Sequence, residues 1–256
     1  MKDITVIIPL IKLSTSEEKN LFKNCVLSIP DNIQILCVGD DEALDSIQNI
    51  EGVDYSKIKT LVNVGDTTLP SQVNLAVENI STPYFSVLEF DDTFTSHWFE
   101  NVETYSNKIN ENVIGYLPLT EVVDYNTSDV LGYANEAFWA SSFSDEIGFM
   151  DNTCLQDYLN INTHGGVFDV EMFKSAGKLK PSMKILYWYE FLLRITYKGK
   201  KVFVIPKVGY IHNINRAGSS NTNRNMSEKE FDWWLDLANK EYFFSNDRNK
   251  TYQEEK

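Results

Sequence analysis

Four short apolar runs mark the first ninety residues, and each is followed by a segment with helical spacing of its apolar positions. The runs are rich in β-branched residues, which is typical of buried strands. They cover residues 4–9, 33–38, 59–64 and 84–90, and the helical segments between them cover 17–28, 43–50 and 67–80. This alternation predicts an α/β fold, with a mostly parallel central sheet flanked by helices.

The pattern loosens after residue 92, but it still predicts a second half of the same domain. We expect helices over 94–105, 154–160, 170–176 and 183–197, strands over 113–125 and 201–206, and polar loops over 126–144 and 210–220. Residues 163–166, Thr-His-Gly-Gly, predict a flexible junction where backbone could approach a ligand. The predicted organisation is therefore 1–110, 111–225, and a C-terminal amphipathic helix and tail over 226–256.

Composition narrows the classes of function. The chain has 256 residues and a net charge of −14, which disfavours a nucleic-acid partner because phosphate binding needs a dense supply of Lys and Arg. The three cysteines are isolated from one another, which favours a reducing, cytoplasmic compartment. The first ten residues resemble a strand rather than a signal peptide, and no segment is long enough for a membrane span.

The run over 84–90 ends in an acidic cluster. Glu89, Asp91 and Asp92 follow or close this strand, and ligands of open α/β sheets bind beyond the carboxyl ends of strands. Glu89 and Asp91 are two residues apart, so they should point the same way. Hard oxygen ligands on one face suit Mg²⁺ or Mn²⁺ carrying a diphosphate. The alternative is a simple turn with Asp92 or Thr93 as a helix N-cap.

The order of these motifs resembles a family 2 glycosyltransferase of the GT-A fold. ITVIIPL, ILCVGDDEA and LVNVGD are followed by QVNLAVENISTPYFSVLEFDD, in which Glu89-Phe90-Asp91 stands at the family's Asp-x-Asp. Asn63-Val64-Gly65 matches an Asn-x-Gly element, whereas the usual Arg beside Asn74 is missing. More loosely, HGGVF, YWYEFLLR and KVFVIPKVGYIH resemble the acceptor side, so the likeness covers about residues 1–220.

The resemblance implies a metal-dependent, inverting transfer of a sugar from a nucleoside diphosphate, UDP above all, to an acceptor hydroxyl. Residues 1–110 would bind the nucleotide-sugar donor and 111–225 the acceptor, which could be a glycan, a protein or a small molecule. The implied cofactor is Mn²⁺ or Mg²⁺.

The resemblance also implies roles for individual residues. Asp91 and His212 would be the metal ligands. The donor would contact Pro9, Leu10, Asp40, Asp41, Asn63, Asn74, Glu89, Phe90, Arg216 and Ser219. Two alternatives remain open. His212 could be a loop histidine that bonds backbone, and Asn74 could be a residue that packs its helix against the sheet. His97 and His164 are expected to be structural.

The general base is where the sequence departs from the family. The family's usual Glu-Asp pair aligns with Tyr187 and Trp188, neither of which can deprotonate a hydroxyl. Glu190, one turn later, is the nearest acid and the predicted catalytic base at the mouth of the cleft. Its alternative role is an ion pair with Arg194 on the same helix face.

Two other classes of function compete with the transferase. A binding module of the same fold, with affinity for a sugar nucleotide or glycan and no transfer, is favoured by the missing acids and the missing Arg. A nucleotidyltransferase is disfavoured, because residues 10–16 contain no Gly and only one Lys.

Overall fold

A single ten-stranded sheet organises the protein. The computed structural model describes residues 3–109, 112–141, 146–159, 161–216 and 227–239. The sheet order is β3-β2-β1-β4-β9-β6-β10-β5, with β7 on β6 and β8 on β10. The strands are β1 Ile4–Pro9, β2 Gln34–Gly39, β3 Ile58–Val62, β4 Tyr84–Val87, β5 Thr93–Phe94, β6 Val113–Asp124, β7 Val130–Ala134, β8 Phe149–Met150, β9 Val167–Asp169 and β10 Lys201–Ile214.

The sheet is parallel in its N-terminal half and mixed beyond it. β1 to β4 all run parallel, as the alternation of strands and helices predicts. β9 is antiparallel to both β4 and β6, whereas β10 is parallel to β6. The carboxyl ends of β1, β2 and β4 therefore lie at one edge, next to the far end of β10.

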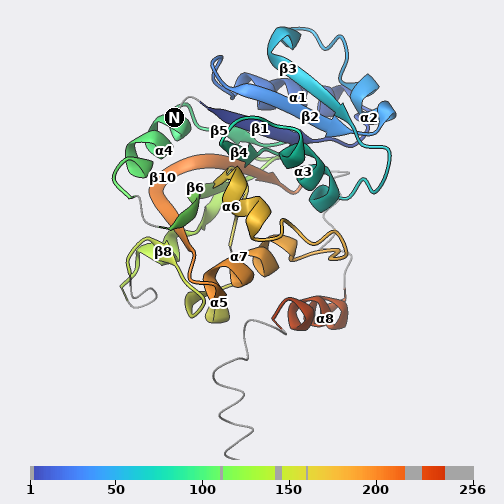
Figure 1. The fold of residues 1–256 in the computed structure, drawn as a ribbon. Coiled ribbons are helices and arrows are strands. Elements are labelled where there is room, and N and C mark those ends of the chain that lie inside the picture. The colour runs from blue at the N-terminus through green and yellow to red at the C-terminus, as the bar shows by residue number, and fades with distance from the viewer. Residues whose placement is uncertain (1–2, 110–111, 142–145, 160, 217–226, 240–256) are drawn as a thin grey trace, which may run out of the picture.

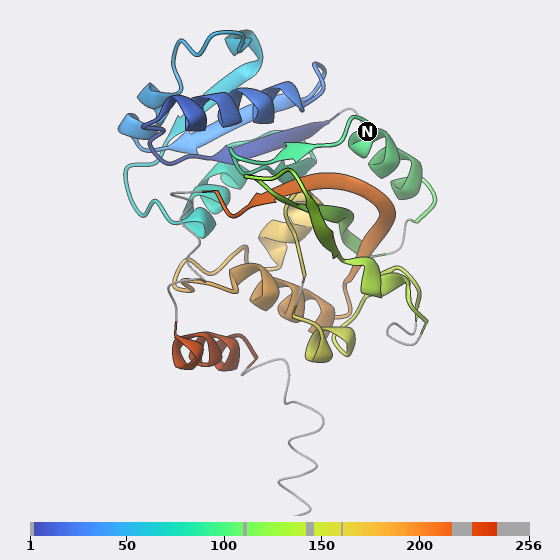
Figure 2. The ribbon, with the colours of Figure 1, turned by 180° about the vertical axis from the view of Figure 1, so that it is seen from behind.

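Helices cover both faces of this sheet (Figures 1 and 2). Residues of α3, α6 and α7 share one buried core with the sheet, and residues of α1, α2 and α4 share the other. The helices are α1 Ser16–Leu27, α2 Asp41–Ser46, α3 Leu69–Glu78, α4 Trp98–Ser106, α5 Cys154–Asp157, α6 Val170–Ser175, α7 Tyr187–Tyr197 and α8 Glu228–Asn239, with short 3₁₀ turns η1 Tyr55–Lys57 and η2 Glu136–Trp139.

Successive side chains of β1 point to opposite faces of the sheet, and helices cover both faces, so β1 has no polar face. Ile7 points into the core beneath α3, whereas Val6 and Ile8 point into the core beneath α1. A strand covered by helices on both faces needs apolar side chains at successive positions, so an uninterrupted apolar run is the expected signature. Thr15 and Glu18 then form a capping box, which satisfies backbone N–H groups at the start of α1.

Several predicted elements are wrong. The polar loop predicted over 126–144 contains strand β7, which pairs with β6. The polar loop predicted over 210–220 is strand up to Ile214, because β10 pairs with β6 along its whole length. The helix predicted from residue 183 begins only at Tyr187, after Leu186 in a left-handed conformation with φ of 58°. The flexible junction predicted over 163–166 leads directly into strand β9, which the sequence pattern did not indicate.

The predicted division into 1–110, 111–225 and 226–256 stays a prediction, and one continuous sheet runs through the first two segments. Among the described residues, no helix has the length and apolar character needed to cross a membrane.

Candidate functional site

The acidic cluster lies in the turn after β4. Oxygen atoms of Glu89, Asp91 and Asp92 all lie within 4.8 Å of one another. The backbone turns back here, with the Asp92 N–H donating to the Glu89 carbonyl at 3.1 Å. The predicted convergence of Glu89 and Asp91 is therefore seen, and Asp92 joins them.

Asp92 is the centre of the site's hydrogen bonding, and it is not a helix cap. Its carboxylate is fully buried and accepts from the Tyr210 hydroxyl at 2.8 Å, from His212 Nδ1 at 2.8 Å and from the Asn213 backbone N–H at 2.7 Å. All three partners come from the part of β10 that the sequence pattern assigned to a loop. The N-cap alternative for Asp92 and Thr93 is wrong, because α4 begins after His97.

His212 carries a proton more readily than an ordinary histidine. Burial alone lowers its pKa, but the hydrogen bond that His212 donates to Asp92 and the nearby charges of Asp92, Glu89 and Asp91 outweigh this and raise the pKa to about 9. The alternative of a loop histidine bonded to backbone is wrong, since the ring partner is a buried carboxylate.

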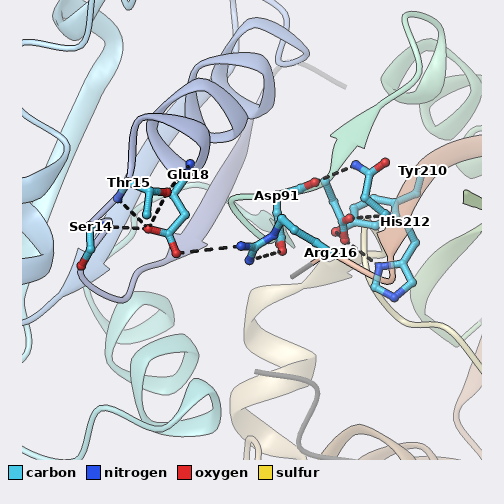
Figure 3. Close-up of polar contacts among 9 residues, drawn as sticks. Ser14, Thr15, Glu18, Asp91, Tyr210, His212 and Arg216 are labelled. Atoms are coloured by element: carbon cyan, nitrogen blue, oxygen red, sulfur yellow. Dashed lines mark hydrogen bonds and ion pairs between the residues drawn. The ribbon is translucent and has the colours of Figure 1, made fainter. Parts of the chain in front are cut away.

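Asp91 faces the site next to Arg216. Burial, with the neighbouring charges of Asp92 and Glu89, raises the pKa of Asp91 to about 6, although Arg216 opposes the shift. The guanidinium lies 3.1 Å from the Asp91 carboxylate and 3.9 Å from that of Glu18 on α1 (Figure 3), and it stacks over the Phe90 ring at 5.5 Å. Arg216 and Phe90 thus lie at the cluster, and their predicted contacts with the donor stay predictions.

His164 belongs to the site, although the sequence analysis expected a structural residue. Its Nε2 lies 3.2 Å from the Glu89 carboxylate, and its ring centroid lies 5.5 Å from that of His212. Ligand atoms of Asp92, His164 and His212 lie within 4.8 Å of one another. His97, in contrast, is exposed and pairs with Glu100 on α4, as expected of a residue outside the site.

Several predicted donor contacts have local structural partners. The Asp40 carboxylate caps α2 by accepting from the Ala43 N–H at 2.8 Å, and Asp41 is the first residue of that helix and exposed. The Asn63 side chain bonds the backbone of Gly65 and Asp66. These contacts order the turns beyond β2 and β3. The roles of Asp40, Asp41 and Asn63 in donor binding stay predictions.

Asn74 bonds the backbone of the segment after α6. Its side chain donates to the Leu179 carbonyl at 2.8 Å and accepts from the Leu179 N–H at 3.1 Å, so it joins α3 to the segment after α6. Pro9 ends β1, and the buried Leu10 bonds Val38 and Gln72 through its N–H. Ser219 lies outside the described residues.

Glu190 does not lie exposed at the mouth of a cleft, and that expectation is wrong. Its side chain is 1% exposed and contacts Arg194 through both carboxylate oxygens, at 3.0 and 2.9 Å, with Lys180 Nζ 2.9 Å away. Arg194 also donates to the carbonyls of Ala176 and Lys178. Glu190 is therefore in the ion pair with Arg194 that was predicted as its alternative role. Trp188 is buried in the hydrophobic core.

The donor set fits a divalent cation. Two groups of possible ligand atoms share Asp92: one adds Glu89 and Asp91, and the other adds His164 and His212. Mixed oxygen and nitrogen donors of this kind bind Mn²⁺ and related ions. Asp92 gives His212 an oriented, hydrogen-bonded ring, as carboxylates behind metal-bound histidines do. Glu89, Asp91, His164 and His212 are each partly exposed, so an ion could reach them.

No protein-family model matches the sequence, and no curated protein sequence matches it. Solved structures do match. Staphylococcus aureus TarS 1–349 in complex with UDP-GlcNAc aligns with a TM-score of 0.69 and 13% identity, over 96% of this chain and 67% of that chain. The complex with UDP aligns with a TM-score of 0.65 and 12% identity, over 96% and 66%.

This chain has the GT-A fold. It spans about two thirds of TarS 1–349 and 44% of the longer TarS chain, with which it is 14% identical. At such low identity the likeness establishes the architecture, with its curled sheet flanked by helices, and the chemistry has to be argued from the site.

Proposed function

We propose that this protein is a glycosyltransferase that moves a sugar from a nucleoside diphosphate, UDP in the first place, to an acceptor hydroxyl. The transfer is metal-dependent and inverting, as the motif series implies. The observation that carries the proposal is a pair of candidate cation-binding groups at the carboxyl end of β4, which share Asp92: Glu89 and Asp91 complete one group, and His164 and His212 complete the other. Solved structures of the same fold hold UDP and UDP-GlcNAc, which supports a nucleotide-sugar donor.

Charge explains why a cation belongs in this site. The protein carries a net charge of −14, and three carboxylates of the cluster lie within 4.8 Å of one another. A diphosphate brought beside them would be repelled at short range. A bound Mn²⁺ or Mg²⁺ would neutralise the diphosphate and stabilise the departing nucleotide.

Each residue of the cluster has a role in this proposal. Asp91 and His212 would hold the cation, and Glu89 would lie between the cation and the ribose. Asp92 holds the His212 ring with Nδ1 engaged, so that Nε2 is the ring nitrogen directed to a ligand. Arg216 now neutralises Asp91, and with a cation on Asp91 its guanidinium would be available for a phosphate oxygen.

One specific observation favours a second candidate, a binding module that does not transfer sugar. Inverting transfer needs a base for the acceptor hydroxyl, and both oxygens of Glu190 are engaged by Arg194 and Lys180. Tyr187 and Trp188 occupy the positions of the family's two acids. A protein that binds the donor and has no base would match these features.

The release of free nucleotide separates the two candidates. We expect the protein, given a panel of UDP-, GDP- and CDP-sugars with a mixture of glycan acceptors, to release nucleoside diphosphate from one donor only when Mn²⁺ or Mg²⁺ is present. Nucleotide binding without release across the panel would support the binding module instead. If the protein neither binds nucleotide nor releases it, both candidates are refuted.

Glu190→Gln tests the role of that residue in the same assay. Breaking a buried ion pair should cost on the order of 3 kcal/mol in the free energy of unfolding, and transfer per folded molecule should stay within about twofold. Glu230→Gln, in the exposed pair with Lys184, is the matched control and should cost under about 1 kcal/mol. Loss of transfer by a factor on the order of 10² with unchanged stability would make Glu190 the base after all.

A further inference from the structure

The segment that carries His164 is fixed by backbone contacts on both sides of the ring. The Gly165 N–H donates to the Val87 carbonyl at 3.0 Å, and the Gly165 carbonyl accepts from the Trp98 indole N–H at 2.9 Å. The His164 N–H donates to the Asn162 side chain at 2.8 Å. The Thr-His-Gly-Gly junction is therefore a rigid turn that holds its histidine at the end of β4.

Glycine is required in this turn. Gly165 has φ of +71°, and a Cβ there would lie 2.4 Å from the Tyr210 ring. Tyr210 is also the residue whose hydroxyl binds Asp92. The close approach of turn and ring thus sets His164 and the Asp92–His212 pair side by side.

Beyond ring contacts with Tyr210 and His212, the His164 ring has few polar contacts among the described residues. Within the described part of the chain, its Nδ1 is buried without a hydrogen-bond partner, and Nε2 contacts only Glu89, at 3.2 Å. A histidine that served the fold would be expected to bond backbone or a buried side chain. Here the single partner is a carboxylate of the proposed metal site.

The distance between these two atoms suits shared coordination. Two ligand atoms that each lie about 2.1 Å from an ion, at right angles, are about 3.0 Å apart. The 3.2 Å between His164 Nε2 and Glu89 is close to this value. His212, whose ring centroid lies 5.5 Å from that of His164, borders the same space.

We propose that His164 is a ligand of the cation, which makes this a two-imidazole site with His212 and the carboxylates of Glu89 and Asp91. The proposal rests on the proposed function and deepens it. Imidazole nitrogen binds first-row transition ions better than Mg²⁺, which prefers an all-oxygen shell. The site therefore selects Mn²⁺, or a later ion such as Co²⁺, over Mg²⁺.

Mn²⁺ binding, measured with UDP present, tests this directly. Pulsed electron paramagnetic resonance of the wild-type protein should show nitrogen couplings from two imidazoles. His164→Gln should lose one of them, and its Mn²⁺ affinity should fall by at least about tenfold. Mg²⁺ affinity should change less than about threefold, so the preference for Mn²⁺ declines. His97→Gln, the same change at an exposed histidine just before α4, should alter nothing.

The possible failures are distinguishable. If the wild-type protein binds Mn²⁺ with one imidazole, or His164→Gln keeps both the affinity and the spectrum, His164 is not a ligand while the proposed function stands. A transfer rate that falls with an unchanged Mn²⁺ spectrum also overturns the proposal, because His164 would then act on the acceptor. No Mn²⁺ binding by the wild type overturns the metal-dependent function itself.

Discussion

Asp92 is a buried residue that organises the site through its hydrogen bonds. It is fully buried, yet three donors from β10 satisfy its two oxygens. A buried carboxylate is costly unless it is hydrogen-bonded and neutralised, and here a histidine with a pKa near 9 supplies the positive charge. The pair orients the His212 ring and ties β10 to the end of β4.

This pairing makes the stability of the ligand-free protein dependent on pH. The folded pKa of His212, about 9, exceeds the usual 6.5, so its stabilising contribution is complete below pH 6.5 and is lost as pH rises through 9. In His212→Gln that contribution is absent. Urea unfolding in a chelator should therefore show a gap between the two proteins that shrinks by on the order of 2 kcal/mol between pH 6.5 and 9.5. A gap independent of pH would mean that His212 is neutral in the folded protein.

Sequence alone located the site through residues that share a strand end, and it failed where a role depends on distant partners. Asp91, Phe90 and Arg216 were predicted at the cluster. His164 was not, because a single histidine before two glycines gives no sign that its turn meets β4 and Tyr210. Glu190 was placed wrongly, since the charges that neutralise it come partly from Lys180, outside its helix.

At the scale of elements, β10 decides the architecture of the site. Its second half carries polar side chains that bind the turn after β4: Tyr210 and His212 bind the Asp92 carboxylate, and the Asn213 side chain donates to the Asp91 carbonyl. That polarity resembles a loop. The pairing of β10 with β6 joins residues about ninety positions apart in the sequence. A local sequence pattern cannot predict such a pairing. Strands β1, β2 and β4, in contrast, are buried on both faces, and their apolar runs predict them correctly. Strand β3, at the edge of the sheet, is half-exposed.

The turn before β9 is the element whose change should disturb the site most specifically. Gly165→Ala adds a methyl group that meets Tyr210, whereas Gly199→Ala has a similar φ, +73°, with no atom within 4 Å. We expect Gly199→Ala to cost about 1 kcal/mol from backbone strain. Gly165→Ala should cost at least about 2 kcal/mol more, because the packed ring must move.

Thermal or urea unfolding of the two variants measures this difference, and Mn²⁺ titration measures its effect on the site. Only Gly165→Ala should weaken Mn²⁺ binding. Equal losses of stability in both variants would show that the turn is not packed against Tyr210 as described.

At the scale of the whole molecule, the fold brings distant segments to one edge of the sheet. The turn after β4, the turn before β9 and the far end of β10 meet there, with α1 contributing Glu18 beside Arg216 (Figure 3). Polar residues at the carboxyl ends of strands are where open α/β sheets bind ligands. The central claim is that this edge holds a nucleoside diphosphate through a divalent cation.

Calorimetric titration of UDP tests that claim most directly, with Mn²⁺ and then with a chelator, in the wild-type protein and in Asp91→Asn. We predict that Mn²⁺ tightens UDP binding to the wild type by at least about tenfold, and that Asp91→Asn loses this gain, because an amide is a poor ligand for a hard cation. Asp232→Asn, an exposed change on α8, should behave as the wild type. Equal gains in Asp91→Asn and wild type, or no UDP binding at all, would contradict the account.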